Sequence, residues 1–130
     1  MTPDAGVVLG ILERLAERQG DPTLLIYERL FAAHPELEAL FVMDRDGGVR
    51  ASMVQISLEC ILDYVGDRRT AINIVSAARA HHEGYGVPAR LFNAFWIAMT
   101  EAFRAALAED WTPEIEQHWG ALMQALAAID

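Results

Sequence analysis

The chain has 130 residues, which is enough for one compact domain with a hydrophobic core, and we expect a single domain over residues 1–130. Ten basic and nineteen acidic residues give a net charge of −9, which would repel nucleic acids and anionic membrane surfaces. No uncharged apolar run approaches the roughly 20 residues that cross a bilayer, so small ligands and other proteins remain as partners.

Prolines and glycines divide the chain at intervals typical of helices, and no alternating apolar stretch carries a hairpin signal. We therefore predict an all-α domain. The first helix is expected to be capped by Thr2, to have Pro3 at its first position and to end at Gly20. Its apolar stripe consists of Val8, Ile11, Leu12 and Leu15.

The dipeptide Asp21-Pro22 is typical of a second helix start. The inner face of this helix is predicted to carry Leu24, Tyr27, Leu30 and Phe31. His34-Pro35 ends the helix, because the residue before a proline is disfavoured in the α conformation. A short turn over residues 36–39 and a loop over residues 44–48 follow.

Two further helices are predicted at residues 49–65 and 70–82. The apolar face of the first consists of Val54, Leu58, Ile61, Leu62 and Val65. In the second, His82 shares a face with apolar residues, whereas His81 lies about 100° away around the helix.

Pro88 and the pair Thr112-Pro113 each indicate the start of another helix, the latter with Thr112 as the cap. The inward stripe of the first of these helices contains Phe92, Phe95, Trp96, Met99, Phe103 and Leu107. The stripe of the last helix contains Ile115, Trp119, Leu122, Met123 and Leu126. Apolar positions of the first and last helices could serve a homodimer as well as a core.

The N-terminal residues lack the basic start and apolar middle of a secretory signal, so we expect a cytoplasmic protein. The single cysteine, Cys60, cannot form an internal disulfide, which fits a reducing compartment. A small buried apolar residue is the simplest interpretation of this cysteine.

Common enzyme motifs are absent: the sequence has no glycine-rich phosphate loop, His-Glu-x-x-His, Cys-x-x-Cys or Gly-x-Ser-x-Gly. The four histidines are too scattered for a metal cluster, although one of them could be an axial ligand. The pair His81-His82 closes a predicted helix, where the negative end of the dipole favours imidazolium. Capping is therefore the alternative interpretation of this pair.

Three segments in order resemble bacterial globins, particularly the globin domain of flavohaemoglobins and single-domain bacterial haemoglobins. In residues 25–41 the shared residues are Tyr27, Phe31, His34, Pro35, Glu36, Leu40 and Phe41, with Ile26 in place of an aromatic residue. Residues 82–87 with Phe92 match the region of the proximal histidine, and residues 110–114 with Trp119 match the start of the last helix. The resemblance implies a globin fold, with about seven helices around a haem pocket.

By this resemblance a b-type haem lies between the helices predicted at 49–65 and 70–82, with the neutral imidazole of His82 as the iron ligand. Val87 and Phe92 fall at the family's distances from His82. His81, from which the same spacings reach other residue types, is the fallback ligand.

The resemblance also implies roles for two aromatic residues and a valine. Phe41 matches the phenylalanine that packs against the porphyrin, and Val87 lies where an apolar contact to the porphyrin edge is expected. Tyr27 matches the distal tyrosine, whose hydroxyl donates a hydrogen bond to dioxygen, a ligand with partial negative charge when it is bound.

A second distal residue follows from counting back without gaps from the proximal histidine. This places Arg50 where the family often has glutamine or histidine, with Val54 and Leu58 lining the pocket more deeply. An arginine at the pocket mouth could instead bind a haem propionate with its bidentate fork. If the gap that the alignment needs lies outside residues 44–48, Met53 or Gln55 faces the iron.

The chain departs from flavohaemoglobins on the proximal side, where that family supports its histidine with a tyrosine and a glutamate. Phe92 replaces that tyrosine, Met123 stands where the last helix has another tyrosine, and no glutamate matches. Peroxidase-like activity and self-sufficient nitric oxide dioxygenase activity are therefore disfavoured. Turnover would need electrons from an external reductase.

Three hypotheses follow. The first is a haem globin that binds dioxygen, and also nitric oxide or carbon monoxide, and that oxidises nitric oxide when a reductant is supplied. The second is a gas or redox sensor that signals through a protein partner. The third is a haem-free regulatory module with the same fold.

Overall fold

The computed structural model describes residues 1–130 as six α-helices and two short 3-10 helices, without strands. The elements are α1 (Ala5–Arg18), α2 (Thr23–Ala33), η1 (Pro35–Phe41), α3 (Gly48–Val65), α4 (Ala71–Gly84), α5 (Ala89–Leu107), η2 (Ala108–Asp110) and α6 (Pro113–Ala127). The predicted all-α architecture is confirmed. None of the helices combines the length and the apolar character that crossing a membrane requires.

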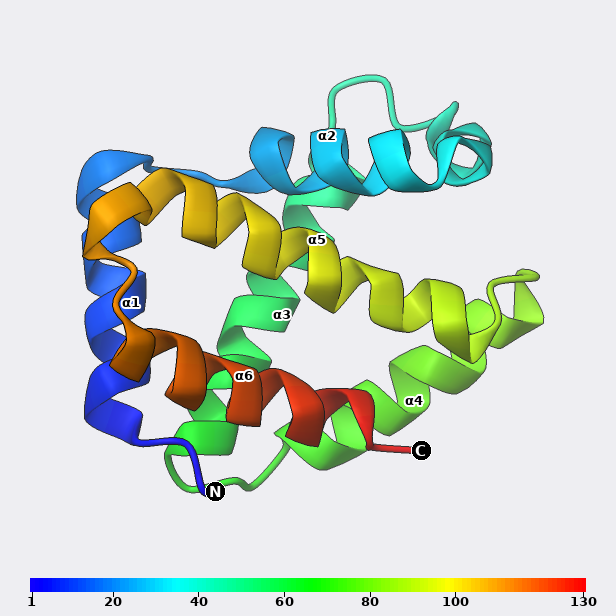
Figure 1. The fold of residues 1–130 in the computed structure, drawn as a ribbon. Helices are drawn as coiled ribbons and strands as arrows, with labels where there is room; N and C mark the ends of the chain where they lie inside the picture. Colours follow the sequence, from blue (N-terminus) through cyan, green and yellow to red (C-terminus); the bar gives the residue numbers. More distant parts are fainter.

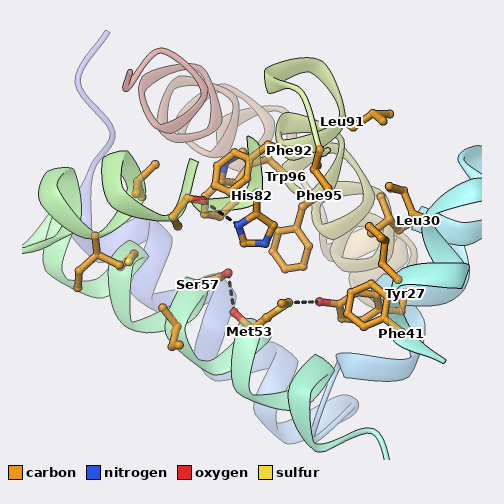
Figure 2. Close-up of a pocket in the computed structure, with 18 residues that line it drawn as sticks. Tyr27, Leu30, Phe41, Met53, Ser57, His82, Leu91, Phe92, Phe95 and Trp96 are labelled. Atoms are coloured by element: carbon orange, nitrogen blue, oxygen red, sulfur yellow. Dashed lines mark hydrogen bonds between the residues drawn. The ribbon is translucent and has the colours of Figure 1, made fainter. Parts of the chain in front are cut away.

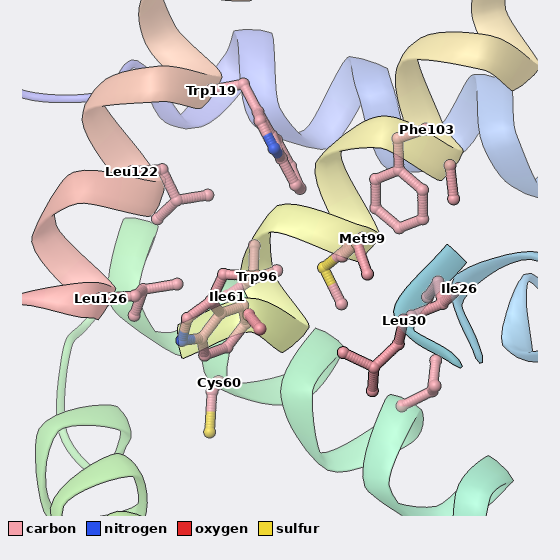
Figure 3. Close-up of a cluster of buried hydrophobic side chains, with 14 of the residues drawn as sticks. Ile26, Leu30, Cys60, Ile61, Trp96, Met99, Phe103, Trp119, Leu122 and Leu126 are labelled. Carbon is pink, nitrogen blue, oxygen red and sulfur yellow. The ribbon is translucent and has the colours of Figure 1, made fainter. Parts of the chain in front are cut away.

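Helix α5 is the central element of the molecule and contacts α1, α2, α4 and α6 (Figure 1). The C-terminal half of α5 forms a tightly packed core with α1 and α6. Figure 3 shows part of this cluster, in which the largest fully buried side chains include Ile26, Ile61, Met99, Phe103, Trp119, Leu122 and Leu126. The fully buried positions of α5 thus lie in its C-terminal half, whereas Leu91 and Trp96 of the N-terminal half, although buried, retain a little exposure.

A short hydrogen-bond chain fixes α6 against α5. The indole nitrogen of Trp119 donates to the hydroxyl of Thr100 at 2.9 Å, and this hydroxyl donates to the carbonyl of Trp96 at 2.9 Å. Burial of the Trp119 side chain therefore leaves no unpaired donor, which is the usual condition for placing an indole in a core.

The capping residue was predicted correctly for α6 but not for α1. The Thr112 hydroxyl accepts from the backbone of Ile115 at 3.2 Å and Pro113 opens α6, as expected. The first helix differs, because Asp4 rather than Thr2 is its cap and accepts from the Val7 backbone at 3.0 Å. Both residues are good caps, and the carboxylate has the stronger attraction to the helix N-terminus.

The inner face of α2 also differs from the prediction. Leu24, expected to point inward, is 79% exposed, whereas Ile26 is fully buried. The buried face of α2 consists of Thr23, Ile26, Tyr27 and Leu30, and Leu24 lies outside this face. Leu62 of α3 is likewise exposed rather than packed.

Helix α4 is held at its start by a residue of the preceding helix, because Thr70 makes no side-chain capping bond. The carboxylate of Asp63 accepts from the backbones of Arg69 (3.1 Å), Thr70 (2.9 Å) and Ala71 (2.7 Å). These bonds, most of all the one from Ala71, hold the pKa of Asp63 below its usual range. Asp63 therefore fixes the position at which α4 begins.

We predict that Asp63→Ala lowers the melting temperature at pH 7 more than Asp67→Ala, whose exposed side chain makes only a surface ion pair with Arg69. The pKa of Asp63 is lower in the folded than in the unfolded chain. Its contribution is therefore complete above the unfolded value of about 4 and is lost as the pH falls through the folded value. Thermal unfolding followed by circular dichroism between pH 7 and pH 3 should show the difference between wild type and Asp63→Ala narrowing with acid. A constant difference would contradict this account.

Candidate functional site

The N-terminal half of α5 lines a cavity of about 170 Å³, closed on its other sides by α2, η1, α3 and α4 (Figure 2). Sixteen of its eighteen lining residues are hydrophobic. The cavity adjoins a surface groove of about 370 Å³, and Leu40, Phe41, Met53, His82 and Val87 line both. The site is therefore an apolar crevice that opens to solvent between η1 and the turn after α4.

The imidazole of His82 enters this cavity with a fixed orientation. Its Nδ1 lies 2.7 Å from the carbonyl oxygen of Ala78, one turn earlier in α4. A carbonyl oxygen can only accept, so Nδ1 is the donor of this bond and Nε2 is the ring nitrogen left for the cavity. The ring of Phe92 packs edge-on against the imidazole, with 5.1 Å between ring centroids. The hydrogen bond to Ala78 thus orients the imidazole as the second-shell partner of a metal-binding histidine does.

The neighbouring His81 has different surroundings. It lines the outer groove but not the cavity, and its exposed ring packs against Tyr85 at 5.0 Å between centroids. Helix α4 continues to Gly84, beyond the predicted end at residue 82, so neither histidine is the last helical residue. Of the two, only His82 points into the cavity.

The turn after α4 is tied to the same histidine. The backbone of Val87 donates to the His82 carbonyl at 2.9 Å, and Gly86 adopts φ +85°, a conformation that favours glycine. Val87 is thereby buried in the cavity wall, where Phe41 and Phe92 also lie.

Tyr27 lies on α2 with only 4% of its surface exposed. Its hydroxyl donates to the thioether sulfur of Met53 at 3.4 Å, and the rings of Phe31, Phe41 and Phe95 surround it at 5.4–5.9 Å between centroids. Burial raises the pKa of the Tyr27 phenol, so the hydroxyl keeps its proton and remains a donor.

Helix α3 presents a different face to the cavity from the one predicted. The lining residues are Met53, Ile56, Ser57 and Cys60, whereas Val54 and Leu58 pack into or against the hydrophobic core. Of the two alternatives to Arg50, Met53 lines the cavity and Gln55 does not. The predicted stripe marks the side of α3 that packs against the core, and the cavity side is less apolar.

The two polar candidates of α3 are engaged outside the cavity. The Arg50 guanidinium is bound to Asp44. Its Nε lies 3.0 Å from the Asp44 carboxylate, and its Nη2 donates to the backbone carbonyl of Asp44 at 2.9 Å. Hydrogen bonds from the backbones of Val49 and Arg50, together with this guanidinium, hold the pKa of Asp44 below its usual range. Gln55 contacts Glu59 on the exposed side at 3.3 Å.

Some lining residues were not assigned to a pocket from the sequence. They include Leu30, Ile74, Leu91, Phe95 and Trp96, which the helical pattern had identified only as core or not at all. Trp96 is notable because its buried indole nitrogen has no hydrogen-bond partner. No sequence signal distinguishes an apolar cavity wall from a packed core.

The sequence matches a known protein family. A protein-family model described as Globin matches residues 24–129, a range that contains every residue lining the cavity. No curated protein matches the chain.

We predict that the Tyr27 phenol resists alkaline ionisation, because burial disfavours the phenolate. The measurement is the ultraviolet absorbance of wild type and Tyr27→Phe during an alkaline titration under folded conditions. The two curves should coincide through the range near pH 10 where free tyrosine ionises. As a control, the same pair in denaturant should differ by one of three tyrosines. A difference of one tyrosine near pH 10 in the folded proteins would show that the phenol is not buried as described.

Proposed function

The chain belongs to the globin family, which implies haem binding, and on this basis we propose that it binds a b-type haem through His82 and takes dioxygen as its gas ligand. One observation carries the proposal. The bond from His82 Nδ1 to the Ala78 carbonyl leaves Nε2 free for iron inside an apolar cavity. A histidine that served only as a helix cap would not need to line an apolar cavity.

The cavity walls suit the chemistry of haem, an apolar plate with a polar edge. Phe41, Val87 and Phe92 would pack against the porphyrin, and the opening into the outer groove would leave its carboxylate edge in water. When bound, the haem supplies iron with a coordination position for a diatomic gas. The protein supplies the imidazole, the dry surroundings and one hydrogen-bond donor.

That donor is Tyr27. Its neutral phenol lies in the cavity wall, and its only hydrogen bond is to a thioether, a weak acceptor. A gas ligand with partial negative charge is a better acceptor, so the hydroxyl would turn to it and retard its escape. The aromatic rings around Tyr27 keep water from competing for this bond.

The proximal side favours binding over chemical activation. The acceptor behind His82 is a neutral backbone carbonyl, and Phe92 stands where a hydroxyl would strengthen the support. Without a carboxylate behind it, the imidazole donates less electron density to iron. We therefore propose reversible gas binding, with nitric oxide dioxygenase activity only where an external reductase delivers electrons.

The finer features of the proposal rest on the sequence alone. They are the single-domain bacterial type, the cytoplasmic location, homodimer formation and the sensing role through a protein partner. Each stays a prediction. The haem-free alternative is tested directly by adding haemin to the purified chain.

We predict that purified protein mixed with haemin shows a Soret band that His82→Ala loses and His81→Ala keeps. The reason is that only His82 reaches the cavity, whereas His81 lies in the outer groove. Absorption spectra and haem content after gel filtration provide the measurement. A wild-type chain that stays colourless would favour the haem-free module, and loss of the band in His81→Ala alone would reverse the assignment.

We predict that Tyr27→Phe increases the rate of oxygen dissociation by about tenfold or more, because a hydrogen bond to a charged acceptor contributes about 1.5–3 kcal/mol. Stopped-flow mixing of the oxygenated protein with carbon monoxide measures this rate. The rate of carbon monoxide dissociation serves as the control. Bound carbon monoxide carries less charge than bound dioxygen, so Tyr27→Phe should change this rate less. Equal oxygen dissociation rates in the two proteins would remove Tyr27 from the site.

A further inference from the structure

The cavity holds few atoms that can donate electrons to a metal besides Nε2 of His82. They are the hydroxyl of Tyr27, the thioether of Met53, the hydroxyl of Ser57 and the thiol of Cys60. Trp96 also lines the cavity, but an indole N–H is a donor of hydrogen bonds only.

Three of these groups are poorly suited to bind iron in their present state. The Ser57 hydroxyl donates to the Met53 carbonyl at 2.8 Å, one turn earlier in its own helix. The Tyr27 hydroxyl carries its proton and donates it to sulfur. Cys60 is a buried thiol in an apolar wall, and metals bind the thiolate.

Met53 differs from these groups because a thioether binds iron without losing a proton. Figure 2 shows its sulfur entering the cavity from α3, while the imidazole of His82 enters from α4. These helices contact each other and form two walls of the same crevice. A histidine and a methionine are a ligand pair that haem iron accepts in electron-transfer proteins.

We propose that the Met53 sulfur is the resting sixth ligand of the iron that His82 holds, so that a gas binds by displacing it. This inference rests on the proposed function, since it requires haem bound through His82. The structure provides the means of displacement. Met53 lines both the cavity and the outer groove, and its unbranched side chain can move from one to the other.

The hydrogen bond from Tyr27 then has two uses. Donation to the sulfur withdraws electron density from the thioether and weakens its bond to iron, which keeps the sulfur displaceable. After displacement the same hydroxyl is free to donate to the gas ligand. Tyr27 thus acts on Met53 as a positioning residue and on the gas as a binding residue.

Competition between the Met53 sulfur and a gas for the iron would lower the apparent gas affinity by a measurable factor. If sulfur occupies the iron in about nine of ten ferrous molecules, the apparent affinity for a gas is about tenfold lower than that of the open site. Removal of the sulfur should raise the apparent gas affinity by the same factor. The haem should be retained, because His82 is unchanged.

The test uses haemin-loaded wild type, Met53→Leu and the control Met99→Leu, which makes the same change at a buried core position outside the cavity. In the ferrous state wild type and Met99→Leu should give six-coordinate, low-spin spectra, and Met53→Leu a five-coordinate spectrum. The carbon monoxide affinity of Met53→Leu should be about tenfold higher than that of wild type, and its reduction potential should be lower, because thioether ligation raises the potential of haem iron.

A measurement on the wild type alone makes the test independent of the variant's folding. Proton spectra of the ferrous protein should contain one methionine methyl signal displaced far upfield by the haem ring. A five-coordinate wild type, or a six-coordinate spectrum that survives in Met53→Leu, would overturn the proposal for Met53. If the Soret band is retained, either result leaves the assignment of His82 intact. Failure of the wild type to take up haemin would overturn both the His82 assignment and the proposal for Met53.

Discussion

A hollow beside a hydrophobic core is tolerated only when the rest of the core is closely packed, because each missing contact forfeits dispersion energy. The two halves of helix α5 differ in this respect. Met99 and Phe103 in its C-terminal half are buried against α1 and α6, whereas Phe92 and Phe95 in its N-terminal half form a cavity wall. The bond from Trp119 to Thr100 joins α6 to the middle of α5, close to the boundary between the two halves.

Features specified by neighbouring residues could be predicted from the sequence. Proline at positions 35 and 113 sets helix limits by sterics alone, and the spacing of Val87 from His82 is set by one turn of the chain. In each case the physical signal lies within a few residues, so no knowledge of distant contacts is needed.

Features that depend on distant packing could not be predicted in this way. Helix α3 is buried on two sides, so its strongest apolar stripe, with Val54 and Leu58, marked the core rather than the cavity. Arg50 is drawn out of the site by Asp44, and the start of α4 is capped by Asp63 from the helix before. Such partners come together only when the turns between the helices are folded.

The division of α5 also bears on how the protein acquires its ligand. Because the fully buried positions of α5 lie outside the cavity wall, packing around them need not wait for an occupant of the hollow. The hollow is then a receptor formed in advance, with its imidazole already oriented by Ala78. Binding to such a receptor costs little ordering entropy, so most of the contact energy is available as affinity. In the cell, this would let the chain be made first and loaded later.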